Sequence, residues 1–138
     1  MLERYRNYLV LGCLGAGLSV ALGAFAAHGL KAKLSERMLA VFQTGVDYQA
    51  YHSLAMLVLV TLALNGKSAD AERYLNRSLQ LMLSGIILFS GSLYAVALSG
   101  IGKLGMITPV GGVLFLLAWG FAARGIWCFG KLKQEQKG

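Results

Sequence analysis

Residues 8–27 read YLVLGCLGAGLSVALGAFAA, an apolar run of 20 residues without a charge. A helix needs about 20 such residues to cross the hydrocarbon layer of a bilayer. Three further apolar runs follow, and the four runs predict membrane spans at about residues 8–28, 45–65, 79–100 and 106–129. We therefore expect an all-α membrane protein, in which residues 1–138 form a single membrane domain built as a four-transmembrane-helix bundle.

The composition of the whole chain agrees with this expectation. The chain is 57% hydrophobic and 14% charged, and its mean hydropathy is +0.61. A soluble domain is usually about a quarter charged, so this chain has too few polar groups to cover a surface that faces water. The net charge of +7 comes from basic residues that flank the apolar runs and form no basic face. We expect contacts with anionic membrane lipids and no nucleic-acid partner.

The distribution of Lys and Arg predicts the orientation in the membrane. Nine of them lie in the N-terminal tail, in the connection between the second and third spans, or at the C-terminal end, whereas the other two connections carry four. The side richer in Lys and Arg is normally cytoplasmic. We expect a multi-pass protein of the bacterial inner (cytoplasmic) membrane with both termini in the cytoplasm. The nine residues are Arg4, Arg6, Lys67, Arg73, Arg77, Arg124, Lys131, Lys133 and Lys137.

Local signals predict where helices begin. Ser68, followed by Asp70 and Glu72, is typical of a helix N-terminus, and so is Thr108 followed by Pro109. Residues 34–39 mix apolar and charged side chains before the second span. They predict a short interfacial amphipathic helix between the first two spans.

Small residues recur every four positions in two of the predicted spans. Such stripes let helix backbones approach closely in lipid. We expect them to pack the helices of the bundle together, and the alternative is an interface with a partner or a second copy of the chain. The helix-packing residues predicted in this way are Gly15, Ser19, Gly23, Gly91 and Ala95.

Polar side chains gather near the span ends that the predicted topology places in the outer half of the bundle. They are His28, Gln43, Thr44, Asp47, Tyr48, His52, Ser92 and Tyr94. Polar groups at membrane depth either form hydrogen bonds between helices or serve a function. Structural hydrogen bonding, a site for a small ligand, lipid headgroup or quinone-like molecule, and a surface for a partner protein therefore all stay open. The two histidines and Asp47 match no recognised spacing of metal ligands, so we expect neither a metal nor a cofactor.

The sequence contains no motif of a nucleophilic, zinc or nucleotide-binding enzyme. We therefore expect a non-enzymatic accessory or scaffold subunit that interacts with lipids or other membrane proteins, in a larger complex or as a homo-oligomer. The alternative is a small transporter or ligand-binding membrane protein that uses the polar site.

Four short motifs carry a resemblance to a known family. They are residues 23–28 (GAFAAH), 42–52 (FQTGVDYQAYH), 89–94 (FSGSLY) and 108–112 (TPVGG). Their order and spacing resemble the YgdD/YwdK-like family of small inner-membrane proteins, the domain-of-unknown-function 423 family, which is related to small eukaryotic transmembrane proteins. Asp47 stands where the family commonly has Glu, which keeps the charge. The resemblance implies a four-helix inner-membrane protein and assigns no activity.

Overall fold

The computed structural model describes residues 2–66 and 68–135, and the side chains of residues 3–66 and 68–129. Within these residues the chain is helical and has no strand. The elements are α1 (Leu2–Phe25), continued by the π-helical turn η1 (Ala26–Leu30), α2 (Glu36–Asn65), α3 (Ala69–Gly85), the π-helical turn η2 (Ile86–Ser90), α4 (Gly91–Ser99), the 3-10 turn η3 (Gly102–Met106) and α5 (Thr108–Glu135).

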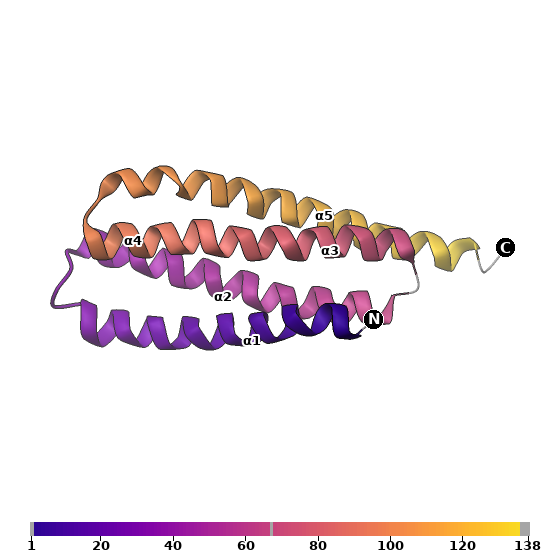
Figure 1. The fold of residues 1–138 in the computed structure, drawn as a ribbon, viewed down its shortest axis with the longest axis horizontal. Helices are drawn as coiled ribbons and strands as arrows, with labels where there is room; N and C mark the ends of the chain where they lie inside the picture. The colour runs from indigo at the N-terminus through magenta and orange to yellow at the C-terminus, as the bar shows by residue number, and fades with distance from the viewer. Residues whose placement is uncertain (1, 67, 136–138) are drawn as a thin grey trace.

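The helices form four long rods that run along one common direction (Figure 1). One rod is α1, the second is α2, the third is α3, η2 and α4 in succession, and the fourth is α5. α1 packs mainly against α2, α2 also packs against the third rod, and α3 packs against α5. Both termini lie toward the same end of the molecule. At this end an ion pair of 2.8 Å between Arg4 and Glu72 joins α1 to α3.

The start of α2 corrects one prediction. No separate interfacial helix lies between α1 and α2, because residues from Glu36 onward form the first turns of α2 itself. Ser35 caps this helix by accepting a hydrogen bond of 3.3 Å from the Met38 N–H, and no proline interrupts the helix before Asn65. The glycine within it, Gly45, is buried rather than at a break.

The other two predicted helix starts lie at or next to the predicted residues. Ser68 caps α3 through the Ala71 N–H, as predicted, at 3.2 Å. α5 begins at Thr108, so Pro109 is its second residue. α4 ends at Ser99 and is capped by Gly100, whose φ of 72° suits a residue without a Cβ.

Three helical segments of the described chain are long and apolar enough to cross a membrane, namely Glu3–Leu30, Ala69–Ser99 and Gly102–Phe129. α2 is not among them. The prediction of four such spans is therefore confirmed for three helices and not for α2. Polar residues of α2 such as Gln49, His52 and Ser53 lower its mean hydropathy, and these three side chains are buried inside the bundle.

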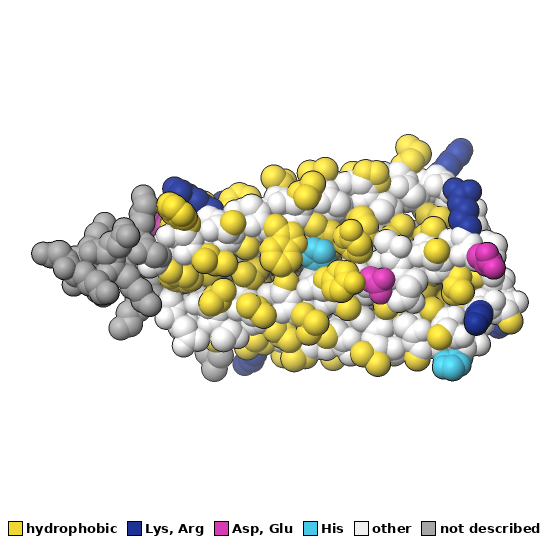
Figure 2. Space-filling model, turned by 180° about the vertical axis from the view of Figure 1, so that it is seen from behind, with side chains coloured by type: hydrophobic (Ala, Val, Ile, Leu, Met, Phe, Trp, Pro, Cys, Tyr) yellow, Lys and Arg dark blue, Asp and Glu magenta, His cyan; other side chains and the backbone are white. Residues whose placement is uncertain are grey.

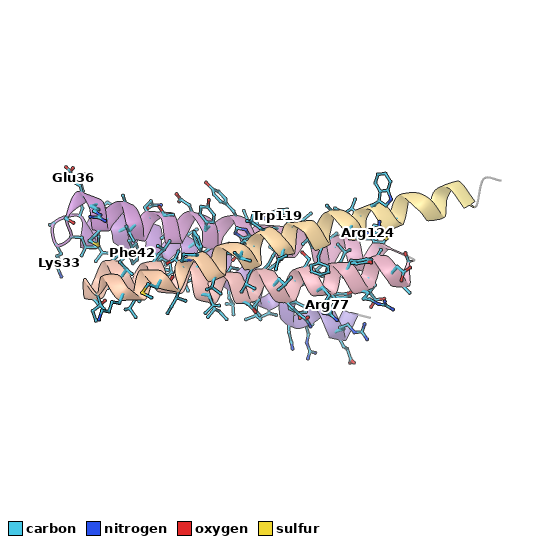
Figure 3. The ribbon with its side chains drawn as sticks, turned by 90° about the horizontal axis from the view of Figure 1, so that it is seen from above. Lys33, Glu36, Phe42, Arg77, Trp119 and Arg124 are labelled. Carbon is cyan, nitrogen blue, oxygen red and sulfur yellow. The ribbon has the colours of Figure 1, made fainter. Side chains whose placement is uncertain are left out.

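The outer surface is apolar along most of its length and charged toward its ends. Val20 and Leu116, for example, are each 75% exposed. Figure 2 shows hydrophobic side chains over the middle of one face, and Figure 3 shows Lys33 and Glu36 at one end and Arg77 and Arg124 toward the other. This pattern is typical of a surface that meets lipid in the middle and headgroups at both ends. Of the basic residues used to predict orientation, Lys67 and Lys137 and the side chains of Lys131 and Lys133 lie outside the described residues.

The predicted small-residue stripes differ in how closely they pack. Gly15 lies directly against Ser53 of α2, and Ser19 is buried nearby. A Cβ added at Gly23 would meet only Val46, at an ordinary 3.6 Å, and one added at Gly91 would meet nothing within 4 Å. Ala95 is half-buried. Close glycine contacts also lie outside the predicted stripes, at Gly45, Gly66, Gly85 and Gly111.

Candidate functional site: a polar cluster within the bundle

Gln49 connects three helices from the middle of α2. Its side chain is 4% exposed. Its amide Nε2 donates to the Gly15 carbonyl of α1 at 2.8 Å, and its Oε1 accepts from the Tyr94 hydroxyl of α4 at 2.9 Å. The amide therefore fixes α1 and α4 on two sides of α2.

Two glycines make room for this bridge. At Gly45, an added Cβ would lie 2.7 Å from the Tyr94 ring, so only glycine lets the tyrosine lie this close to α2. The Tyr94 ring also packs on Phe42, with 4.8 Å between ring centroids. At Gly15, the missing side chain leaves the space that the Ser53 hydroxyl occupies. The glycines thus set the helix separation at which a glutamine can reach both neighbours.

His52 lies three residues further along α2 and is 5% exposed. Its Nδ1 is 2.7 Å from the Tyr48 carbonyl oxygen, and its Nε2 is 3.2 Å from the indole Nε1 of Trp119 on α5. A carbonyl oxygen only accepts and an indole N–H only donates. Both contacts are hydrogen bonds only if the ring is neutral and carries its proton on Nδ1.

Aromatic rings surround His52 and extend the contact between α2 and the last two rods. The imidazole stacks on Phe115 of α5, with 3.5 Å between centroids and 12° between planes. Tyr48 stacks on Phe89 of η2 at 4.6 Å. These stacked rings are further attractive contacts between α2 and its neighbours.

A separate hydroxyl pair joins α4 to α5. The Ser92 and Thr108 hydroxyl oxygens are 2.6 Å apart, and Ser92 also donates to the Phe89 carbonyl at 2.9 Å. Since Ser92 has one hydroxyl proton, Thr108 is the donor of the pair. Thr108, which the sequence predicts as a helix cap, thus contributes a bond between helices.

The structure brings four of the eight predicted polar-site residues into these contacts and leaves four outside them. Tyr48, His52, Ser92 and Tyr94 belong to the contacts just described. Gln43 and Asp47 bond to each other on one face of α2 at 2.9 Å, and Thr44 bonds back to the Ala40 carbonyl at 3.0 Å. His28 is exposed in η1. Figure 2 shows one histidine near the middle of the face and the other at an end of the molecule.

Gln49 and Trp119 are central to the geometry but absent from the predicted site. Gln49 lies on the same helix face as Gly45 and Ser53, each four residues away, and this small and polar face is the signal that points inward. Trp119 carries no comparable signal, because an aromatic residue inside an apolar span is ordinary.

Two buried hydroxyls of the site region, those of Ser53 and Ser90, have no hydrogen-bond partner. No group of three or more His, Cys, Asp or Glu suited to a metal ion occurs within the described residues. The hydrogen bonds described above nevertheless connect most of the cluster's other polar groups across helices.

Comparisons with known proteins identify relatives over most of the chain. A family model described as "Protein of unknown function (DUF423)" matches residues 22–112. A UPF0382 membrane protein from Staphylococcus aureus (strain bovine RF122 / ET3-1) is 43% identical over 81% of this chain and 88% of its own length. The UPF0382 membrane protein YwdK from Bacillus subtilis (strain 168) is 44% identical over 81% and 89%. A UPF0382 membrane protein from Haemophilus influenzae (strain ATCC 51907 / DSM 11121 / KW20 / Rd) is 42% identical over 82% and 87%.

No solved structure matches the chain. The sequence resemblance is confirmed by the family model and by these relatives, which are named as membrane proteins. The chain belongs to the DUF423 family.

Proposed function

We propose that this chain is a four-pass protein of the bacterial inner membrane that acts as a non-enzymatic accessory or scaffold subunit for other membrane proteins. The observation that carries the proposal is the way its polar cluster is bonded. Gln49, His52, Tyr94 and the Ser92–Thr108 pair bond to groups within the bundle. A site that binds or converts a substrate needs polar groups that point to a free space, whereas bonds between helices give a rigid body.

The position of α2 supports a fourth span. α2 has 30 residues, which corresponds to about 45 Å of helix. It packs against α1 on one side and against the rod of α3 and α4 on another. Each of these two neighbouring rods is long and apolar enough to span a membrane. A helix that lies alongside two spans crosses the same layer. Its buried Gln49 and His52 are shielded from lipid by these neighbours.

The proposed location in the inner membrane and the proposed cytoplasmic position of the termini are each supported by a further observation. Proteins that span the bacterial outer membrane are closed β-barrels, whereas the described chain is helical. The excess of Lys and Arg lies on the side of the termini. Fusing a periplasm-active phosphatase and a cytoplasm-active fluorescent protein to each terminus tests the orientation. Fluorescence without phosphatase activity at both ends is expected, and phosphatase activity at either end contradicts it.

The outer face of α1 is the surface that we propose for a partner helix. α1 packs mainly against α2, so its opposite face is open. Val10 and Leu14 are 49% and 64% exposed there, and a Cβ added at Gly17 would meet nothing within 4 Å. A small residue between exposed apolar ones lets a second helix approach closely in lipid.

Gly17→Leu tests this surface, with Gly120→Leu as the matched control. Both glycines are exposed, and neither has an atom within 4 Å of an added Cβ, so both variants should fold. Each is purified from native membranes in a mild detergent and examined by native mass spectrometry. We expect one defined membrane partner, or a second copy of the chain, with the parent and with Gly120→Leu, and its loss with Gly17→Leu. A parent that is a lone monomer contradicts the proposal, as does a partner that Gly17→Leu retains.

A further inference from the structure

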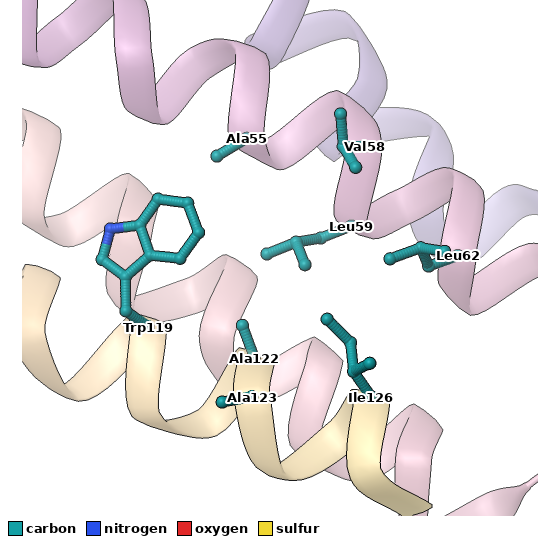
Figure 4. Close-up of a pocket in the computed structure, with 8 residues that line it drawn as sticks. All are labelled: Ala55, Val58, Leu59, Leu62, Trp119, Ala122, Ala123 and Ile126. Atoms are coloured by element: carbon teal, nitrogen blue, oxygen red, sulfur yellow. The ribbon is translucent and has the colours of Figure 1, made fainter. Parts of the chain in front are cut away.

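A groove lies between α2 and α5, on the side of His52 that faces the C-terminal end of α2. Its volume is about 310 Å³. Figure 4 shows four residues of α2 facing four residues of α5 across it. The lining residues are Ala55, Val58, Leu59, Leu62, Trp119, Ala122, Ala123 and Ile126.

The groove has a buried floor and an exposed rim. Leu59 and Ala122 form the floor and are 3% and 2% exposed, whereas Val58 and Ile126 on the rim are 59% and 48% exposed. Every lining side chain is apolar except for the indole N–H of Trp119, which already donates to His52. An occupant therefore meets hydrocarbon on all sides and has no polar group to bind.

One aromatic ring lines the groove at one end, and another lies beyond its opposite end. Trp119 extends from α5 toward α2 at one end (Figure 4). Beyond Leu62 and Ile126, the Phe129 ring lies directly against Gly66, where a side chain would have no room. The stretch 55–62 of α2 corresponds to about 10 Å of helix, which is shorter than the roughly 15 Å thickness of half a hydrocarbon core. The groove thus has the length of part of one leaflet.

The dimensions distinguish between two kinds of occupant. A helix with its side chains is about 10 Å wide, so 10 Å of it occupies roughly 800 Å³, which exceeds even the 630 Å³ or so of empty space in and above the groove. A single flexible hydrocarbon chain is narrow enough to enter the open side and lie along the floor. Because the α5 segment that lines the groove lies within a candidate span, acyl chains are the surrounding solvent there.

We propose that this groove is a binding site for one acyl chain of a membrane phospholipid, with Trp119 as its end wall. The site needs the helices to lie in a bilayer and does not depend on the proposed accessory role. A bound chain fills the space between α2 and α5 that protein side chains leave open. It also covers the exposed side of the Trp119 ring, which is 48% exposed.

The test uses Trp119 as a reporter. The chain has two tryptophans, so Trp127→Phe leaves Trp119 as the only one. The purified, delipidated full chain in detergent is titrated with phosphatidylcholine brominated on its acyl chains, since bromine quenches indole fluorescence on contact. We expect quenching that saturates at about one lipid per protein. The converse variant, Trp119→Phe, keeps the exposed Trp127 and should show quenching that rises with lipid without saturating.

Ala55→Phe fills the groove, and Ala21→Phe places the same ring on the exposed surface of α1. In the Trp127→Phe background, Ala55→Phe should abolish the saturable quenching and Ala21→Phe should keep it. Ala123→Phe, on the exposed rim, replaces Ala55→Phe if circular dichroism shows that the latter has lost its helix content. Native mass spectrometry should show one retained phospholipid for the parent and none for the filled variant. Saturable quenching that remains in a folded variant with a filled groove overturns the site. Quenching of Trp119 that does not saturate in the Trp127→Phe protein also overturns it.

Discussion

The interface of α5 with α3 and η2 and the interfaces of α2 with α1 and α4 are held together in different ways. At the first, glycines let other atoms approach closely. A Cβ added at Gly111 would lie 2.8 Å from the Cα of Phe89, and one at Gly125 would lie 3.0 Å from Leu75. Among the described residues, a hydrogen bond of 2.7 Å from Ser78 to the Ala118 carbonyl joins α3 to α5, and the Arg124 guanidinium lies over the Tyr74 ring, 5.7 Å from its centroid.

At the interfaces of α2, Gly15 and Gly45 also let atoms approach closely, but side-chain hydrogen bonds cross these interfaces as well. Gln49 bonds to both α1 and α4, and His52 bonds to Trp119 of α5. In lipid, helices have no hydrophobic drive to associate, so dispersion at close approach and polar bonds are the two means available. The comparison teaches that the interface of α5 should fail mainly when atoms are added, whereas the interfaces of α2 should also fail when polar atoms are removed.

The largest expected effect is that of Gly111→Ala. Its Cβ would overlap the backbone of Phe89, which cannot move away as a flexible side chain would. We expect a loss of about 1–3 kcal/mol in the free energy of unfolding, because backbones must separate. Titration with a denaturing detergent, followed by circular dichroism, measures it.

The neighbouring glycine is the control for this prediction. A Cβ added at Gly112 would lie at an ordinary 3.8 Å from the Phe89 ring. Gly112→Ala should therefore change stability by less than about 0.5 kcal/mol. Equal effects of the two substitutions would show that close approach at Gly111 does not hold this interface.

Gln49→Leu should have the next largest effect. It removes two bonds between helices and leaves the Tyr94 hydroxyl without its partner. At about 0.6 kcal/mol for an average bond between membrane helices, we expect a loss of about 1–2 kcal/mol in the same titration. Gln43→Leu is the matched control, since Gln43 is exposed and bonds only within α2, to Asp47. A similar loss for both would contradict the bridging role of Gln49.

His52→Phe tests the bond to Trp119 while it keeps a ring on Phe115. We expect a loss of about 0.6–1.7 kcal/mol, the range for one bond between membrane helices. In the parent, nitrogen NMR of the labelled imidazole should show the neutral ring protonated on Nδ1, as both contacts require. A ring protonated on Nε2 alone would contradict the bond from Trp119.

The all-helical fold could be predicted from the sequence, because a long apolar run in lipid must satisfy its backbone hydrogen bonds within itself and does so as a helix. The start at Ser68 could be predicted too, since a cap depends on local sequence. The continuity of α2 could not, because whether residues 36–44 lie at an interface or extend a helix depends on their neighbours. Within the site, burial decides which polar groups meet. The helix face that Gln49 shares with Gly45 and Ser53 indicates that Gln49 points inward, but the sequence does not show that its amide meets Gly15 and Tyr94.

The central claim is that the polar cluster holds the helices of this protein together. The hydroxyl group of Tyr94, a single atom group of this cluster, gives the most direct test. Tyr94→Phe removes one hydroxyl and keeps the ring on Phe42. It is combined with Gln49→Leu in a double-mutant cycle, with the free energy of unfolding measured for all four proteins. We expect the two losses not to add, with a coupling energy of about 0.6 kcal/mol and at most about 1.7. Strictly additive losses would contradict the claim.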